Sequence, residues 1–167
     1  MSKEESLKQK ILQAHKDEDI ASLYVMEQEA HETFDEETLH GFYANILDLA
    51  LEKLTNTLEA HRKMDIQDVQ DFATLRALYE YAIEHYSADD KASAAALFEV
   101  LSGLSNDPKF SDAMKVHWIA AQENLPFENF LDTIADIDAT QKAGTFYIGE
   151  FQQKAQELLD KTQEKGK

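Results

Sequence analysis

The chain has 167 residues, enough for one domain with a buried core, and its hydrophobic fraction of 43% is too high for a disordered chain. Because the chain has only five glycines and two prolines, helices are favoured over short strands. The absence of cysteine excludes disulfides, thiolate metal sites and a cysteine nucleophile. A net charge of −17 opposes binding to phosphate backbones and anionic lipids, so we expect neither nucleic acid nor a membrane as partner.

Apolar residues recur at three- and four-residue steps along most of the chain, as they do in amphipathic helices. At the N-terminus, Ser2 and Glu5 have the spacing of a capping box and predict a first helix that runs to about Ala14. A second helix is expected from Ile20 to about Ala30.

The next stretch, HETFDEETLH at positions 31–40, holds two histidines and four acids and raises the question of a metal site. A zinc-protease motif needs His-Glu-x-x-His on one helix, and here the fifth position is Asp35. A di-iron bundle needs two Glu-x-x-His pairs, and Glu37 with His40 is the single such pair in the sequence. We therefore expect no metal or other cofactor here.

The same stretch has the signals of a helix entrance. Either Thr33 and Glu36 form a capping box, or Asp35 is the N-cap, with Phe34 and Leu39 at the positions of a hydrophobic staple. Both alternatives place acids in the first turn, where the helix dipole favours them.

The remaining helices follow from apolar stripes and turn signals. We expect a helix to about His61, one from Asp65 or Asp68 to Tyr86, and one that starts at Ser87 to Asp90 and ends where Gly103 and the sequence SNDP break the chain. Further helices are expected at 110–125 and 126–134, then a loop over DIDATQKAG at 136–144, and a last helix that carries Phe146 to Leu159.

These patterns predict an all-α fold of about seven to eight helices in antiparallel pairs, as a helical bundle or a helical-repeat-like stack. We expect a single domain over residues 1–160 and a polar, frayed tail over 161–167. The sequence contains no apolar run long enough for a signal peptide or a membrane span, and the lack of cysteine fits a reducing compartment, so we expect a cytoplasmic protein.

The segment from Leu78 to Pro108 resembles one hairpin of the tetratricopeptide repeats. Ala82 and Ala94 have the twelve-residue spacing of that family's two small residues, and Phe98 follows four residues after Ala94, as in its A-x-x-x-F element. The family's tyrosine position holds His85, and no second repeat follows. The resemblance implies a helical-repeat-like interaction module.

Acidic residues are unevenly distributed. Between Lys16 and Lys53 the chain has eleven acids and no lysine or arginine. These acids either keep a solvated surface soluble or form a docking surface for a basic partner. For such a surface we select four acids and three aromatic residues that could line a groove: Glu29, Glu32, Glu36, Glu37, Trp118, Phe127 and Phe130.

The sequence lacks a phosphate-binding glycine loop and a nucleophile elbow, so we expect no enzyme and assign no catalytic residue. The favoured hypothesis is an adaptor, small chaperone or assembly factor that binds a basic or amphipathic protein or peptide. One alternative is a helical-bundle enzyme or small-ligand-binding protein with an interhelical pocket, for which His117 with Tyr86 or Tyr147 is a candidate. Another is a homo-oligomeric structural protein.

Overall fold

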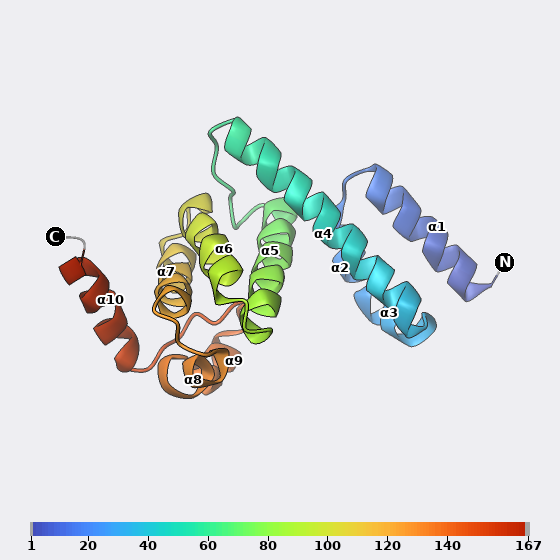
Figure 1. Cartoon of the computed structure of the whole chain (residues 1–167). Helices are drawn as coiled ribbons and strands as arrows, with labels where there is room; N and C mark the ends of the chain where they lie inside the picture. The colour runs from blue at the N-terminus through green and yellow to red at the C-terminus, as the bar shows by residue number, and fades with distance from the viewer. Residues whose placement is uncertain (1, 166–167) are drawn as a thin grey trace. The chain divides into compact units, whose positions relative to one another are not determined.

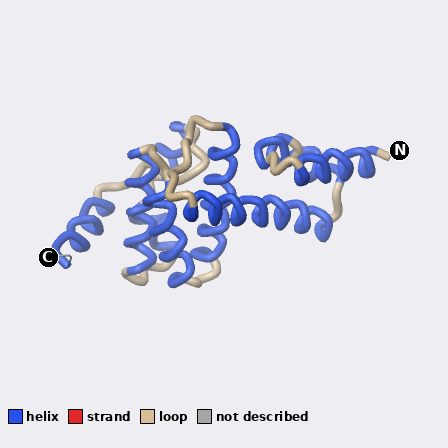
Figure 2. The backbone as a smooth tube through the Cα atoms, turned by 90° about the horizontal axis from the view of Figure 1, so that it is seen from above, coloured by secondary structure: helices blue, strands red, loops and turns tan. Residues whose placement is uncertain are grey.

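A computed structural model describes the backbone of residues 2–165 and the side chains of residues 2–161. Ten α-helices and one π-helical turn make up the regular secondary structure of this described part, which has no strand (Figures 1 and 2). An isolated bridge joins Ala135 and Phe151. The predicted all-α class is confirmed. Every helix within the described residues is too short or too polar to cross a bilayer.

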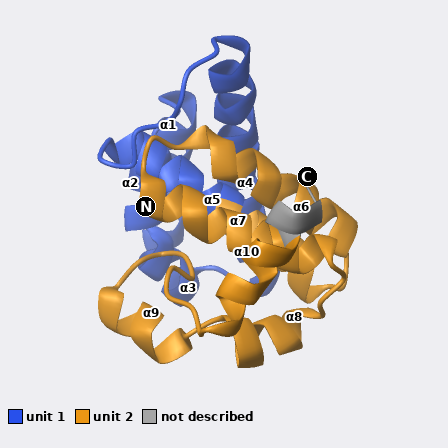
Figure 3. Ribbon diagram, turned by 90° about the vertical axis from the view of Figure 1, so that its left-hand side faces the viewer, with its two compact units in different colours: residues 1–78 blue, residues 79–167 orange. Residues whose placement is uncertain are grey.

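Packing divides the chain into two compact units, Met1–Leu78 and Tyr79–Lys167 (Figure 3). We call them unit 1 and unit 2. The division falls within α5 (Val69–Ser87), so this helix contributes its first half to unit 1 and its second half to unit 2. The expected single domain over residues 1–160 stays a prediction.

Unit 1 begins with α1 (Lys3–Lys16), α2 (Ile20–Val25), α3 (Glu27–Thr33) and α4 (Glu36–Glu59). As predicted, Ser2 caps α1, and its hydroxyl accepts a hydrogen bond from the Glu5 backbone N–H. The expected helix from Ile20 to Ala30 is broken at Met26, which ends α2 and precedes α3.

Asp35 forms the entrance to α4. Its side chain accepts a hydrogen bond of 2.7 Å from the backbone N–H of Thr38, and this bond lowers the pKa of the Asp35 carboxyl. Thr33 is the last residue of α3, so the alternative capping box with Glu36 does not form. The stretch HETFDEETLH is therefore a helix end followed by a helix entrance.

The core of unit 1 lies where α1 packs against α2, α3 and α4. Helical spacing brings the apolar side chains of these helices to one side, and each is less than 10% exposed: Leu7, Ile11, Leu23, Ala30, Phe34, Phe42 and Ile46. Burial of this apolar surface holds the four helices together.

Unit 2 contains the rest of α5, α6 (Lys91–Leu104) and α7 (Pro108–Gln122). The start of α6 corrects the sequence analysis: Ser87 still belongs to α5, and Asp90 is the N-cap, accepting from the backbone N–H of Ser93. Gly103 lies within α6 and does not end it. The break falls at 105–107, and Pro108 occupies the first turn of α7.

The chain after Pro126 departs most from expectation. It forms α8 (Phe127–Asn129), the π-helical turn Phe130–Ile134 and α9 (Ile137–Ala143). The segment DIDATQKAG is thus not a loop: Asp136 caps α9 by accepting from the N–H of Ala139, and Gly144 ends it at a φ of 71°.

The last helix begins later than the sequence predicts. Residues 146–153 are not helical, because the backbone of this segment pairs with the end of the π-helical turn: Asp136 donates to the carbonyl of Glu150, and Gln152 donates to the carbonyl of Ile134. The final helix is α10 (Lys154–Lys165). It takes in residues 161–165 of the expected frayed tail, and residues 166–167 lie outside the described residues.

Aromatic rings dominate the core of unit 2. Tyr79, Tyr86, Phe98, Phe110 and Phe130 are all at most 5% exposed. Their rings pack at centroid distances such as 6.2 Å between Tyr86 and Phe98 and 5.7 Å between Tyr86 and Phe130. The Tyr86 hydroxyl also donates to the carbonyl of Leu125, which ties α5 to the segment that follows α7.

Candidate functional site: the groove between α1 and α4

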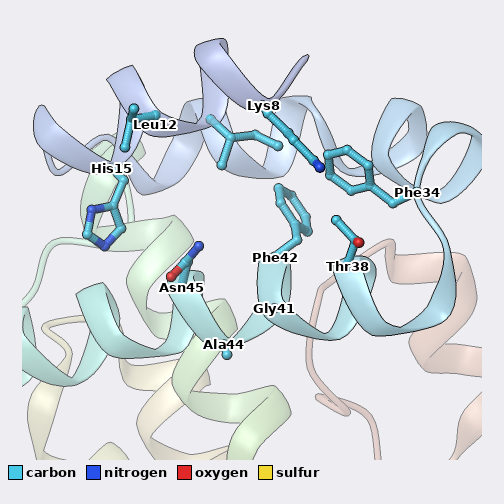
Figure 4. Close-up of a pocket in the computed structure, with 10 residues that line it drawn as sticks. Lys8, Leu12, His15, Phe34, Thr38, Gly41, Phe42, Ala44 and Asn45 are labelled. Atoms are coloured by element: carbon cyan, nitrogen blue, oxygen red, sulfur yellow. The ribbon is translucent and has the colours of Figure 1, made fainter. Parts of the chain in front are cut away.

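An open groove of about 600 Å³ runs between α1 and α4 in unit 1 (Figure 4). The two helices run in the same direction along it, since Lys8 lies near Thr38 at one end and His15 lies near Asn45 at the other. We call it the α1/α4 groove.

The floor of the groove is apolar. Ile11, Phe34 and Phe42 form it, and Phe42 points from α4 towards α1. These three side chains are also core residues, with exposures of 8%, 9% and 3%, so the floor is a rigid part of unit 1. A partner that covered it would remove additional apolar surface from water.

The walls of the groove are uneven because the side chains along α4 are small. Gly41 and Ala44 lie on the α4 wall, and a β-carbon placed on Gly41 would meet no atom within 4 Å. On the α1 wall, Leu12 is 55% exposed, although a leucine at this position of an amphipathic helix is expected to be covered. The groove thus offers an exposed apolar side chain next to an open space.

Four polar side chains also line the groove: Lys8 and His15 from α1, and Thr38 and Asn45 from α4. The Lys8 ammonium lies 3.3 Å from the carboxylate of Glu4. The groove thus combines an apolar middle with hydrogen-bonding groups along its edges, a combination that binding surfaces share.

The acids of this region are predicted from the sequence, but the groove itself is not. Glu29 and Glu32 are exposed on α3, and Glu36 and Glu37 are exposed in the first turn of α4. Glu37 is one helical turn before Gly41, which places it at the edge of the groove. The residues missed are Leu12, Gly41 and Ala44. The available signal was the pair of small residues on one face of α4, which leaves space beside any helix that packs there.

The three selected aromatic residues belong to unit 2. Trp118 in α7 and Phe127 in α8 are half-buried, while Phe130 is completely buried. The rings of Phe127 and Phe130 stack with centroids 6.4 Å apart. Phe130 is a core residue and cannot contact a partner in this structure, which corrects its selection as a surface residue. The four selected acids lie in unit 1.

His31, the first histidine of HETFDEETLH, takes part in a polar network of unit 1. Its Nε2 lies 2.7 Å from the hydroxyl of Tyr43, and that hydroxyl donates to Glu27 at 2.5 Å. Glu27 also pairs with Arg76 at 3.2 Å, and the Arg76 guanidinium lies 4.0 Å from the ring centroid of Tyr24. This network joins α2, α3, α4 and α5 and gives His31 a structural role.

His117 is the histidine proposed for an interhelical pocket. It is completely buried in α7, where its Nδ1 lies 2.7 Å from the carbonyl of Ala113 and its Nε2 lies 2.8 Å from the hydroxyl of Tyr79. Burial lowers the pKa of His117 to about 4. The Tyr79 hydroxyl in turn accepts from the backbone N–H of Ile148. The partner is therefore Tyr79, and neither Tyr86 nor Tyr147 bonds to the imidazole.

Both nitrogens of His117 are hydrogen-bonded inside the core, and Tyr79 also bonds to Ile148. The pair of His117 and Tyr79 therefore holds the segment after α9 in place within unit 2. Burial raises the pKa of Tyr79, so both groups remain neutral around pH 7. The geometry gives this pair a structural role.

Within the side chains that the structure describes, no three His, Asp or Glu residues gather in a way that could hold a metal ion. No protein-family model, curated protein or solved structure matches the chain. The α1/α4 groove, with its apolar floor, is the candidate site.

Proposed function

We propose that the protein is a non-enzymatic interaction module, an adaptor, small chaperone or assembly factor, whose α1/α4 groove binds an amphipathic helix of another protein. The observation that carries this proposal is the apolar groove itself, with Phe34 and Phe42 in its floor and the exposed Leu12 on its wall. An amphipathic helix that lies in a groove of this kind inserts apolar side chains at three- and four-residue steps.

The charge of the chain supports a partner with basic residues. A net charge of −17 attracts cationic surfaces and repels nucleic acids and anionic membranes. The lack of cysteine suits a reducing compartment such as the cytoplasm. In unit 2, Ala82, Ala94 and Phe98 are all fully buried, as the small and aromatic residues of a tetratricopeptide-like hairpin would be.

The proposal is tested by blocking the groove. In Gly41→Leu a side chain is added where the structure has open space, so the fold is retained and the groove is filled. The matched control is Gly103→Leu, because Gly103 is also a helical glycine beside open space but lies on α6 of unit 2. The probe is a fluorescent, cationic amphipathic peptide with leucines on one face and lysines on the other.

We expect Gly41→Leu to weaken binding of this peptide about tenfold or more, equivalent to about 1.4 kcal/mol, and Gly103→Leu to leave it unchanged. Amide chemical shifts in a nuclear magnetic resonance titration should change along α1 and α4. The proposal is wrong if the peptide does not bind, or if both variants bind it as the unchanged protein does.

The size of the groove favours a second candidate function. About 600 Å³ is within the range of small-molecule sites, and Lys8 lies at the edge of an apolar floor. An apolar molecule with an anionic group would fit this chemistry. Mass spectrometry of an organic extract of the purified protein tests the candidate: a stoichiometric ligand that Gly41→Leu fails to retain would support it over the helix.

A further inference from the structure

The two walls of the α1/α4 groove differ in charge. Helix α1 carries four lysines and two glutamates, and α4 carries five acids and one lysine. The ionisable groups that line the groove, Lys8 and His15, both come from α1. A partner in the groove therefore meets the Lys8 ammonium on the α1 side.

Acids stand at both ends of the α4 wall. Glu37 is four residues before Gly41, and Asp48 is four residues after Ala44, so all four lie on one stripe of α4. Each of the four is exposed. Because Gly41 and Ala44 are small, long basic side chains of a docked helix can extend across them to Glu37 and Asp48.

On the α1 wall, the Lys8 ammonium is available to a partner. Its ion pair with Glu4 is largely exposed, with 54% and 47% of the two side chains accessible, and exposed pairs of this kind are weak in water. A docked acidic side chain can therefore bond to Lys8, whereas a docked lysine on the same side would be repelled.

We infer that the α1/α4 groove selects a helix whose apolar stripe has basic residues along one flank and acidic residues along the other. The inference rests on the proposed function and specifies the partner's surface. The net charge of −17 attracts a uniformly basic helix from a distance, but screening at physiological salt limits that attraction to about 8 Å. The charges of the two walls then decide between partners.

The test compares three peptides of about 18 residues that share one leucine stripe, since this length supports a helix. Both flanks are lysine in the first, both are glutamate in the second, and the third has one flank of each. At about 0.15 M salt, we expect fluorescence anisotropy to show that the mixed peptide binds about fivefold more tightly than the lysine peptide.

Two variants with the same change in net charge show whether Lys8 causes the preference. In Lys8→Glu the cation on the groove wall becomes an anion, and we expect the lysine peptide to bind more tightly than the mixed one. Lys10→Glu is the control, because Lys10 is exposed on α1 but does not line the groove. This variant should retain the preference for the mixed peptide.

The outcomes distinguish a failure of the flank inference from a failure of the proposed function. If the lysine peptide binds as tightly as the mixed one, and Gly41→Leu abolishes binding of both, the flank inference is wrong and the proposed function stands. If none of the three peptides binds, both are wrong. If the chain sediments as a dimer without peptide and Gly41→Leu returns it to a monomer, the occupant is a second copy, which overturns the inference.

Discussion

At the scale of single residues, two kinds of position have a marked effect on the structure. Buried polar groups such as His117 and Tyr79 are kept because each has a hydrogen-bond partner inside the core. Glycines have different roles according to their surroundings: Gly41 lies beside open space, whereas Gly149 lies against the ring of Tyr147. Both effects can be measured.

The pKa of His117 makes stability depend on pH. The folded pKa of about 4 is below the ordinary value of 6.5, so between these values the unfolded chain binds a proton that the folded chain does not. The free energy of unfolding should therefore fall as the pH is lowered from 7 towards 5, with a contribution from His117 of about 2 kcal/mol.

Urea unfolding at several pH values, compared with that of His117→Leu, measures this contribution. The variant is less stable at pH 7 because the Tyr79 hydroxyl loses its acceptor, but its stability should depend less on pH. Equal pH slopes in the two proteins would show that His117 is not the group that titrates.

Of three glycine-to-alanine substitutions, two should stabilise the protein and one should destabilise it. Gly41→Ala and Gly103→Ala replace helical glycines beside open space, and each should raise the free energy of unfolding by about 1 kcal/mol through a loss of chain entropy in the unfolded state. In Gly149→Ala the new β-carbon would lie 2.8 Å from Cε2 of Tyr147, a buried ring, and stability should fall by about 1–3 kcal/mol.

Thermal and urea denaturation of the three variants provide the comparison. A stable Gly149→Ala would mean that the Tyr147 ring can move away without cost. A destabilised Gly41→Ala would mean that the space between α1 and α4 is smaller than the structure shows.

At the scale of helices, capping residues explain where sequence reasoning succeeds. Ser2 and Asp35 were predicted from the type of side chain and its spacing, and both accept the expected backbone hydrogen bond. Helix α9 was missed because it has seven residues and no apolar stripe, with Thr140 its one buried side chain. The bounds of α9 are marked by its N-cap, Asp136, and its C-cap, Gly144.

The stretch from Phe146 to Phe151 shows the opposite error. Its aromatic residues have helical spacing, but the segment is not helical, and its side chains pack into the core of unit 2. The ring centroids of Tyr147 and Phe110, for example, are 5.0 Å apart. The groove could not be predicted either. It depends on which faces of α1 and α4 meet, and the two helices are separated by about thirty positions in the sequence.

The N-cap of α7 offers a test of capping in unit 2. The side chain of Asp107 accepts from the backbone N–H of Phe110 at 3.0 Å. Asp107→Ala should lower the free energy of unfolding by about 1 kcal/mol, whereas Asp107→Asn, which retains an acceptor, should lower it by only a few tenths, roughly. Urea denaturation measures both. If Asn were as costly as Ala, the charge of Asp107 would matter more than its hydrogen bond.

At the scale of the whole molecule, charge is the dominant property. Thirty-three acids against sixteen lysines and arginines leave a net charge of −17, and the excess acids repel one another in the folded state. Ion pairs such as Lys53 with Asp71 at 3.0 Å are partly exposed and offset little of this repulsion.

Added salt should therefore stabilise the protein. Between about 0.02 M and 0.5 M sodium chloride, screening shortens the range of repulsion among the acids, and the melting temperature should rise by several degrees. Thermal denaturation followed by circular dichroism measures the change. A melting temperature that falls with salt would show that attractive pairs outweigh the repulsion.

The chain has a single tryptophan, Trp118, and it lies half-buried on α7 of unit 2. The fluorescence of the indole therefore reports on the surroundings of Trp118, while the circular dichroism signal comes from helices in both units. Denaturation curves recorded with the two signals on one sample would coincide if the units melt in a single step and separate if they do not. The molecule thus carries its own optical probe of cooperativity, with no label attached.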